Sequence, residues 1–124
     1  MRKKHLQLLV LILGGYMTLM NIGVQTSEVA LRNDHYRRAG IGFMMTPGAM
    51  ELPDVCGLIC AVQRFDDFNA DNDPYGEHDF GKIEWNGRNV FWKIDYYDQK
   101  MKCFMDPLSK DCNRLLTLMR ADEY

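Results

Sequence analysis

The sequence has only three histidines and four prolines in 124 residues, and it lacks the short motifs that mark common enzyme sites. It contains no nucleophile elbow, no P-loop and no dinucleotide-binding fingerprint. Internal repeats, low-complexity tracts and linkers rich in proline, glycine or serine are also missing. The formal net charge of -2 provides no general basic field, which argues against a nucleic-acid binder that works through one.

The composition is that of one small folded domain. A hydrophobic fraction of 47% over 124 residues can fill a modest core. The charge is unevenly distributed, because residues 1–38 hold six Lys/Arg and two Asp/Glu, whereas residues 66–98 hold nine Asp/Glu and three Lys/Arg. The middle of the chain is therefore acidic.

Residues 1–27 form a leader-like hydrophobic N-terminal segment. Met-Arg-Lys-Lys-His precedes an apolar run from Leu8 to Met20, which is interrupted by two glycines and a threonine. This pattern matches a secretory leader better than a membrane span, which needs about 20 mostly apolar residues, although no small-x-small cleavage site follows. The alternatives are an uncleaved interfacial helix that contacts a membrane through residues 1–20, or an upstream start codon. A true leader predicts a secreted or periplasmic protein, and a start-site artefact predicts a cytoplasmic one.

Four cysteines could form two disulfides in an exported chain, with three possible pairings, and would stay thiols in the cytosol. Cys56 and Cys60 are spaced i, i+4 on a predicted helix, which is neither a CxxC redox motif nor a complete zinc site. Because a free cysteine behaves as a small hydrophobe, we favour buried structural thiols. The set is Cys56, Cys60, Cys103 and Cys112.

Helix start and stop signals predict a first helix that Ser27 caps, that runs through Arg38, and that Gly40 and Gly42 end. A short strand is plausible over residues 42–46.

Apolar spacing predicts two further helices. One spans residues 52–65, with Pro53 in its first turn. The other spans residues 108–121, with Asp106 and Pro107 as its N-cap and first residue.

The clearest element is a β-hairpin. Asn86-Gly87 is the preferred pair for a two-residue type I′ turn, and it joins strands over residues 80–85 and 88–97. This turn sets Gly81 opposite Trp92, where the indole can cover the bare glycine backbone. The predicted buried face carries Ile83, Trp85, Val90, Trp92, Ile94 and Tyr96. The other face carries Phe80, Lys82, Glu84, Asn89, Phe91, Lys93, Asp95 and Tyr97.

A lone hairpin is marginally stable, so the helices must pack on its apolar face. The predicted fold class is therefore α+β. Residues 28–124 form a small single domain whose central antiparallel β-hairpin, with or without a third short strand, is packed by two to three amphipathic helices.

The block DNDPYGEHDFG at residues 71–81 and the run FWKIDYYD at residues 91–98 resemble the signature of a family of uncharacterised bacterial proteins, domain of unknown function 3768. Phe65-Asp66-Asp67-Phe68 also fits, and the run from Arg114 to Met119, with the ending Glu123-Tyr124, looks like the closing helix of that family. The resemblance covers residues 28–124. It implies membership and no activity, cofactor or partner.

The acidic block offers two interpretations. Carboxylates and an imidazole at Glu77, His78 and Asp79 could hold a magnesium or manganese ion for a small hydrolase or nuclease, but on a strand His78 would point away from the other two. A solvated connection that needs its Asn, Asp, Pro and Gly for turns is the more common case. We therefore predict no metal ligand and no cofactor.

The leading hypothesis is a non-enzymatic binding module that uses the acidic, aromatic surface of the hairpin. Its partner would be a protein with a basic surface, and no direct nucleic-acid binding is expected. The alternatives are the metal-dependent hydrolase or nuclease and an acidic mimic of nucleic acid. The candidate binding residues are Asp71, Asp73, Tyr75, Glu77, His78, Asp79, Phe91, Lys93, Asp95 and Tyr97.

Overall fold

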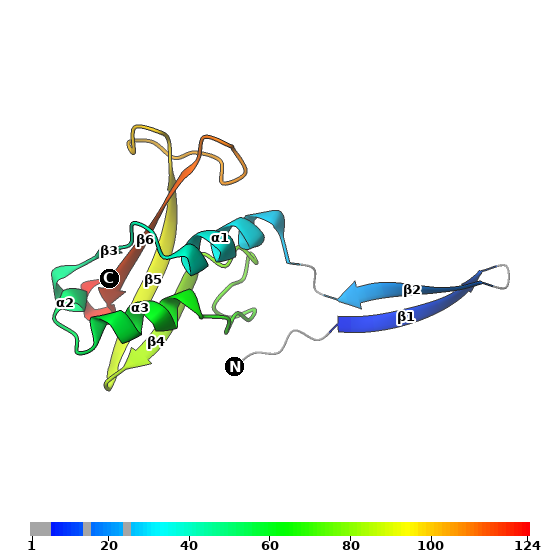
Figure 1. The fold of residues 1–124 in the computed structure, drawn as a ribbon, viewed down its shortest axis with the longest axis horizontal. Coiled ribbons are helices and arrows are strands. Elements are labelled where there is room, and N and C mark those ends of the chain that lie inside the picture. The colour runs from blue at the N-terminus through cyan, green and yellow to red at the C-terminus, as the bar shows by residue number, and fades with distance from the viewer. Residues whose placement is uncertain (1–5, 14–15, 24–25) are drawn as a thin grey trace.

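The computed structural model describes residues 6–13, 16–23 and 26–124 (Figure 1). Strands β1 (Leu6–Leu13) and β2 (Tyr16–Gly23) pair antiparallel in a two-stranded sheet of their own. The segment predicted as a leader thus carries strands where the interfacial-helix alternative requires a helix. Its role as a leader stays a prediction. Among the described residues, no helix is long and apolar enough to cross a membrane.

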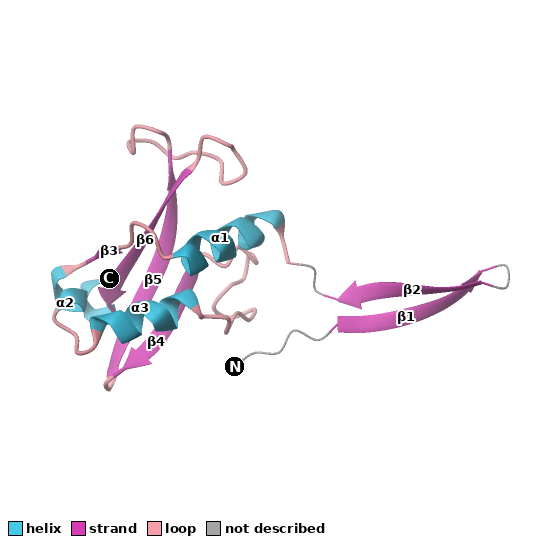
Figure 2. Ribbon diagram, viewed as in Figure 1, coloured by secondary structure: helices cyan, strands magenta, loops and turns pink. Residues whose placement is uncertain are grey.

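The remainder of the chain is a small α+β domain with a four-stranded mixed sheet in the order β3-β6-β5-β4. Helices α1 and α3 lie together over one face of this sheet (Figure 2). The predicted fold class is therefore confirmed, and the sheet is larger than the hairpin alone. In chain order the elements are α1 (Glu28–Ala39), β3 (Met44–Met45), α2 (Pro47–Met50), α3 (Val55–Gln63), β4 (Phe80–Trp85), β5 (Arg88–Tyr97), β6 (Asn113–Arg120) and the 3-10 helix η1 (Ala121–Glu123).

The hairpin of β4 and β5 is confirmed in its bounds and its register. Trp85 lies opposite Arg88 and Gly81 lies opposite Trp92, and both turn residues have positive φ, 49° at Asn86 and 76° at Gly87. A Cβ atom at Gly81 would collide with the indole of Trp92, so this position requires glycine. The predicted inner face packs into the core.

Helix α1 also agrees with the prediction. The Ser27 hydroxyl accepts a hydrogen bond from the backbone N–H of Ala30 at 3.1 Å, and Gly40 ends the helix with φ of 68°. The short strand expected over residues 42–46 is present as β3.

The predicted helix over residues 52–65 is partly wrong. Within this range only α3 is helical, from Val55 to Gln63, and Leu52 and Pro53 lie in the turn that joins α2 to α3. Asp54 is the N-cap of α3, and its carboxylate accepts from the Gly57 N–H at 3.1 Å. Asp54 has left-handed backbone, with φ of 52°, and α3 begins at the next residue, Val55.

The predicted closing helix over residues 108–121 is wrong, because β6 occupies this position. The Asp106 carboxylate accepts from the Leu108 N–H at 2.8 Å, which closes a turn instead of capping a helix. Leu116 and Leu118 are fully buried against β5. Leu115 and Met119, on the other face of the strand, are also apolar, so the sequence shows no simple alternation and resembles a helical stripe.

The core lies between α3 and the sheet, where Phe68 also packs. Its fully buried side chains include Leu58, Val62, Phe68, Val90, Trp92, Leu116 and Leu118.

The prediction of buried thiols is wrong, although all four cysteines are free. Cys56, Cys60 and Cys103 are exposed and Cys112 is partly exposed. The reason lies in α3, which turns Leu58 and Val62 to the core and leaves its two cysteines on the solvent side.

Candidate functional site

The structure distributes the predicted site residues over separate places. Asp73, Glu77 and His78 contact α1 or its partners on the helix-covered side of the sheet. Phe91, Lys93, Asp95 and Tyr97 lie on the opposite face, by their alternation along β5. Asp71 and Tyr75 are exposed on the connecting loop, and Asp79 is half-buried just before β4.

The acidic loop over residues 66–79 is held by its own side chains. The Asn69 side-chain oxygen accepts from the N–H groups of Asp71 and Asn72 at 2.9 and 3.0 Å, and the Asn72 amide donates to the Asp67 carbonyl at 2.7 Å. One oxygen of Asp73 accepts from the N–H groups of Glu77 and His78 at 3.0 and 3.2 Å. Much of the signature block therefore serves to build the loop.

His78 fixes this loop to α1. Its Nδ1 lies 3.0 Å from both carboxylate oxygens of Asp34, and its ring stacks on Phe68 with the centroids 3.8 Å apart and the planes 4° apart. The side chain is buried, and Nε2 lies 3.6 Å from an oxygen of Asp73. A carboxylate can only accept, so Nδ1 carries a proton and donates it. His78 is a structural residue in this arrangement.

Asp34 belongs to a buried polar cluster on α1 that the sequence reasoning missed. Arg37 is fully buried and donates to Asp34 at 2.9 Å and to the carbonyls of Val62 and Phe65 at 3.0 and 2.8 Å. Burial raises the pKa of Asp34, but hydrogen bonds from His78 and Arg37 outweigh it and hold that pKa below its usual value. The signal in the sequence was the spacing of Ala30, Asn33 and Arg37, which places polar residues on the core side of the helix.

Asn33 connects this cluster to the end of the sheet. Its amide nitrogen donates to the Glu77 carbonyl at 2.9 Å and to the Tyr96 hydroxyl at 2.8 Å, and its oxygen accepts from Arg114 at 2.7 Å. The Tyr96 hydroxyl donates to the Glu77 carboxylate at 3.0 Å. Burial, and next the carboxylates nearby, raises the pKa of Tyr96, which keeps the phenol protonated.

Asp79 is the most perturbed carboxyl group of the loop. Burial, and next the negative charge of Glu77, raises its pKa to about 6. Glu77, His78 and Asp79 do not converge, since Tyr96 bonds Glu77 and Asp34 bonds His78. In the described part of the chain, no three or more His, Cys, Asp or Glu side chains are grouped so that they could hold a metal ion.

The outer face of the hairpin is aromatic but not acidic. The rings of Phe80 and Phe91 lie 5.2 Å apart, and Tyr124 lies 5.6 Å from Phe91 and 6.4 Å from Phe80. Beside them Lys93 and Asp95 form an ion pair of 3.1 Å. The predicted residues thus fall on two surfaces: Phe91, Lys93, Asp95 and Tyr97 on the outer face of the hairpin, and Asp71 and Tyr75 on the acidic loop.

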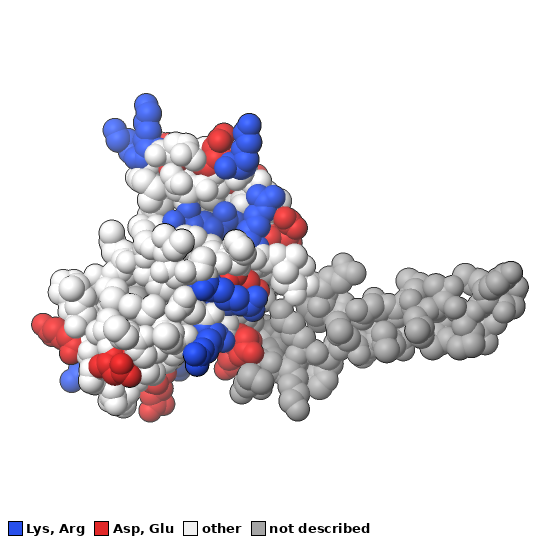
Figure 3. Space-filling model, in the orientation of Figure 1, with Lys and Arg blue, Asp and Glu red and all other residues white. Residues whose placement is uncertain are grey.

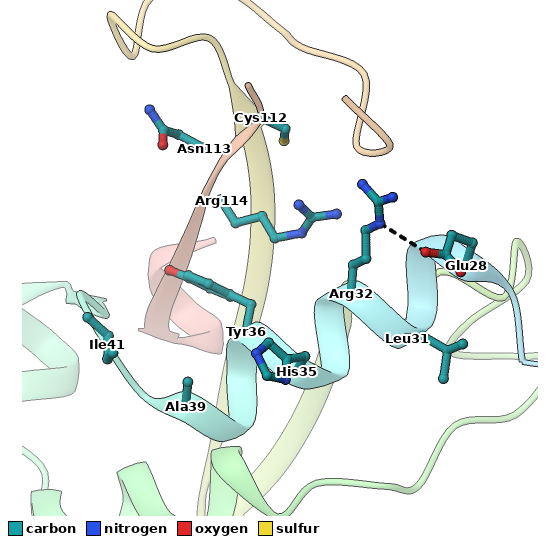
Figure 4. A pocket seen from close by; sticks show the side chains of 10 residues that line it. All are labelled: Glu28, Leu31, Arg32, His35, Tyr36, Ala39, Ile41, Cys112, Asn113 and Arg114. Carbon is teal, nitrogen blue, oxygen red and sulfur yellow. Dashed lines mark hydrogen bonds and ion pairs between the residues drawn. The ribbon is translucent and has the colours of Figure 1, made fainter. Parts of the chain in front are cut away.

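A groove lies beside α1, at the end of the domain where β6 begins (Figure 4). Its volume is about 640 Å³, in the range of ligand sites in proteins. None of the predicted site residues lines it. The lining residues are Glu28, Leu31, Arg32, His35, Tyr36, Ala39, Ile41, Cys112, Asn113 and Arg114.

Two arginines give the groove its charge. Arg32 donates to the Glu28 carboxylate at 3.1 Å and to the Leu108 carbonyl at 2.8 Å, and Arg114 donates to the Pro107 carbonyl at 2.7 Å. Their guanidinium groups point toward one another in Figure 4. Among the described residues that line the groove, Glu28 is the only carboxylate, and Lys and Arg side chains gather over this part of the molecule in Figure 3.

Together the fold and its sites define a small two-layer α+β protein with a buried ion cluster that holds an acidic loop, and a cationic groove on one side of its first helix. The chain belongs to the family described as "Protein of unknown function (DUF3768)", which matches residues 45–123. No curated protein and no solved structure shows significant similarity to the chain.

Proposed function

We propose that the protein is a non-enzymatic binding module whose ligand occupies the groove beside α1. The observation that carries this proposal is the groove itself, which combines a volume of about 640 Å³ with an apolar wall and two facing guanidinium groups. Sites of this kind, mostly apolar with a few convergent polar groups, bind ligands in many proteins.

The apolar wall is exposed without a covering element in the described chain. Leu31 is 52% exposed and Ile41 is 76% exposed, and both line the groove. Burying such side chains under a ligand removes apolar surface from water, at about 25 cal/mol per Å². An apolar group of the ligand is therefore expected to lie on Leu31 and Ile41.

The charges of the lining favour an anionic group on the ligand. Arg32 and Arg114 face one acidic side chain, Glu28, so the groove carries excess positive charge. Guanidinium groups bind carboxylates and phosphates through charge-assisted hydrogen bonds. We therefore assign the ligand to amphipathic anions.

The test compares two probes with the same alkyl chain length and opposite charge, decanoate and decyltrimethylammonium. We expect decanoate to bind in a 1:1 ratio by isothermal titration calorimetry and to shift amide resonances of the groove, while decyltrimethylammonium does neither. Equal binding of both probes, or no binding of decanoate, would contradict the proposal.

Two matched variants locate the site. Arg32→Gln removes a cation from the groove, and we expect about a tenfold loss of decanoate affinity, because a hydrogen bond to a charged group is worth about 1.5–3 kcal/mol. Arg38→Gln removes an exposed cation from the same helix outside the groove and should leave the affinity unchanged. A similar loss in both variants would indicate a general charge effect.

A second binding surface is favoured by the position of Tyr75. Its side chain is 87% exposed on the hydrogen-bonded acidic loop, where Asp66, Asp67 and Asp71 are also exposed. An aromatic ring among carboxylates attracts cationic side chains. We propose that this surface contacts a protein with a basic surface, as the sequence suggests.

A lysine- and arginine-rich peptide tests that surface. We expect binding that weakens at high salt and that Tyr75→Ala reduces, whereas Tyr124→Ala, at another exposed tyrosine, does not. Binding that is indifferent to both salt and Tyr75→Ala would remove this candidate. No observation in the described residues favours the hydrolase or the nucleic-acid mimic.

A further inference from the structure

We infer that the groove receives an extended, acidic segment of a partner protein, which adds a strand to the free edge of β6. This inference rests on the proposed function of the groove and names the class of its ligand. It depends on the sheet edge, which a small amphipathic anion would not use.

The edge of β6 is only partly covered. Strand β3 pairs with β6 at two positions, Met44 with Thr117 and Met45 with Leu118. At the start of β6, Asn113 and Arg114 pair with β5 and also line the groove. An uncovered strand edge is a template for another strand.

The hydrogen-bonding groups of Arg114 point to the groove. The Ile94 N–H donates to the Asp79 carbonyl, so the backbone N–H and C=O of Ile94 face β4. Leu116 lies opposite Ile94 in the antiparallel pair, so the backbone N–H and C=O of Leu116 face away from β5. The Leu116 N–H accordingly donates to the Tyr36 hydroxyl at 3.1 Å. Arg114 lies two residues earlier, so its N–H and C=O also face the groove.

The chain itself turns away from this edge. A longer β3 would continue along Leu116 toward Arg114, but the pairing with β6 begins only at Met44. Before it, Gly42 has φ of 74° and Gly40 has φ of 68°, which turns the chain away from the sheet. Ile41 is left exposed in the groove wall. The groove therefore lies where the missing part of the edge strand would run.

The side chains around this edge select the sequence of the added strand. Arg32 and Arg114 favour an aspartate or glutamate, and the exposed Leu31 and Ile41 favour aliphatic residues beside it. Backbone bonds to Arg114 would fix the strand, and the charges would reject basic segments.

The experiment uses the full chain and the probe peptide acetyl-Thr-Val-Glu-Val-Thr-amide. We expect the peptide to bind and to slow hydrogen exchange of the Arg114 amide at least tenfold at saturation, which decanoate does not do. The same peptide with lysine in place of glutamate, or with N-methylated alternate amides, should bind at least tenfold more weakly.

Two matched variants give an independent check. Ile41→Glu places a negative charge in the groove and should lower the affinity for the glutamate peptide at least tenfold. Met50→Glu, at an exposed methionine outside the groove, should leave that affinity unchanged.

The outcomes separate the two proposals. Decanoate binding without peptide binding, unchanged exchange of the Arg114 amide, or equal binding of the N-methylated peptide would overturn strand addition and leave the binding groove intact. Failure of both decanoate and the peptide to bind would overturn both.

Discussion

At the scale of single residues, His78 contributes most to fixing the acidic loop. His78→Ala removes the partner of Asp34 and the ring stacked on Phe68, so Asp34 stays buried with Arg37 alone. We expect a loss of about 3 kcal/mol in the free energy of unfolding, as when one partner of a buried pair is removed. Urea unfolding monitored by tryptophan fluorescence measures the change.

The matched control is His35→Ala, because His35 is exposed on α1 and should change stability by about 0.5 kcal/mol or less. A similar small effect of His78→Ala would mean that the loop is held by its other hydrogen bonds.

Asp79 predicts a pH dependence of stability. Its pKa rises from 3.8 to about 6 on folding, so between these values the folded state binds more protons than the unfolded state. The free energy of unfolding should therefore decrease as pH rises from about 4 to 6 and stay lower above that. Asp79→Asn should remove this component, whereas Asp71→Asn, in the exposed part of the loop, should retain it. Urea titrations between pH 4 and 8 decide the case, and parallel curves for wild type and Asp79→Asn would contradict it.

Sequence patterns predicted the turns of the acidic loop but not the contacts that fix the loop to α1. The Asn, Asp and Gly content of residues 69–76 predicts turns, and the side chains do close turns there. Asp34, the partner of His78, lies 44 residues earlier, so only the tertiary structure reveals the pair. The groove could not be predicted from the sequence for the same reason, because residues of α1 line it together with residues 112–114, which are distant in the sequence.

At the scale of elements, β6 is an interior strand of the four-stranded sheet, between β3 and β5. Thr117 pairs with Lys93 at a position where its N–H faces β5, so Thr117→Pro would remove a central ladder bond. We expect this variant to lose about 3 kcal/mol or more of stability, or to remain unfolded. Thr117→Val keeps a β-branched residue and should stay near wild type in thermal unfolding followed by circular dichroism. If residues 108–121 formed a helix instead, valine at position 117 would be tolerated no better than threonine. The far-ultraviolet circular dichroism spectrum would then also differ from that expected for a strand.

The hairpin and β6 show why one element was predictable and the other was not. Asn86-Gly87 fixes the chain reversal locally, so the register of β4 and β5 follows from the turn. In β6, Leu115 and Met119 are apolar on the face opposite Leu116 and Leu118, so the period-2 signal is lost. Apolar residues on both faces of a short strand have the spacing of a helix.

At the scale of the whole molecule, the domain needs an element outside the region that defines its family. The family match begins at Met45, whereas α1 lies before it. Asn33 and Asp34 of this helix hold the acidic loop, and Arg37 lies over Trp92. Removing α1 would leave His78 without Asp34 and would expose the faces of Trp92 and Phe68 that Arg37 covers.

We therefore expect a fragment of residues 26–124 to unfold cooperatively on heating and to show the near-ultraviolet circular dichroism of packed aromatic rings. A fragment of residues 45–124 should show neither, because core surface left in water and a buried His78 without its hydrogen-bond partner cost several kcal/mol against a typical stability of about 5–15 kcal/mol. Cooperative unfolding of the shorter fragment would show that the sheet, α2 and α3 form the stable unit and that α1 is an addition to it. The loss of that unfolding transition, with the longer fragment intact, would make residues 26–44, which include α1, a requirement of the fold.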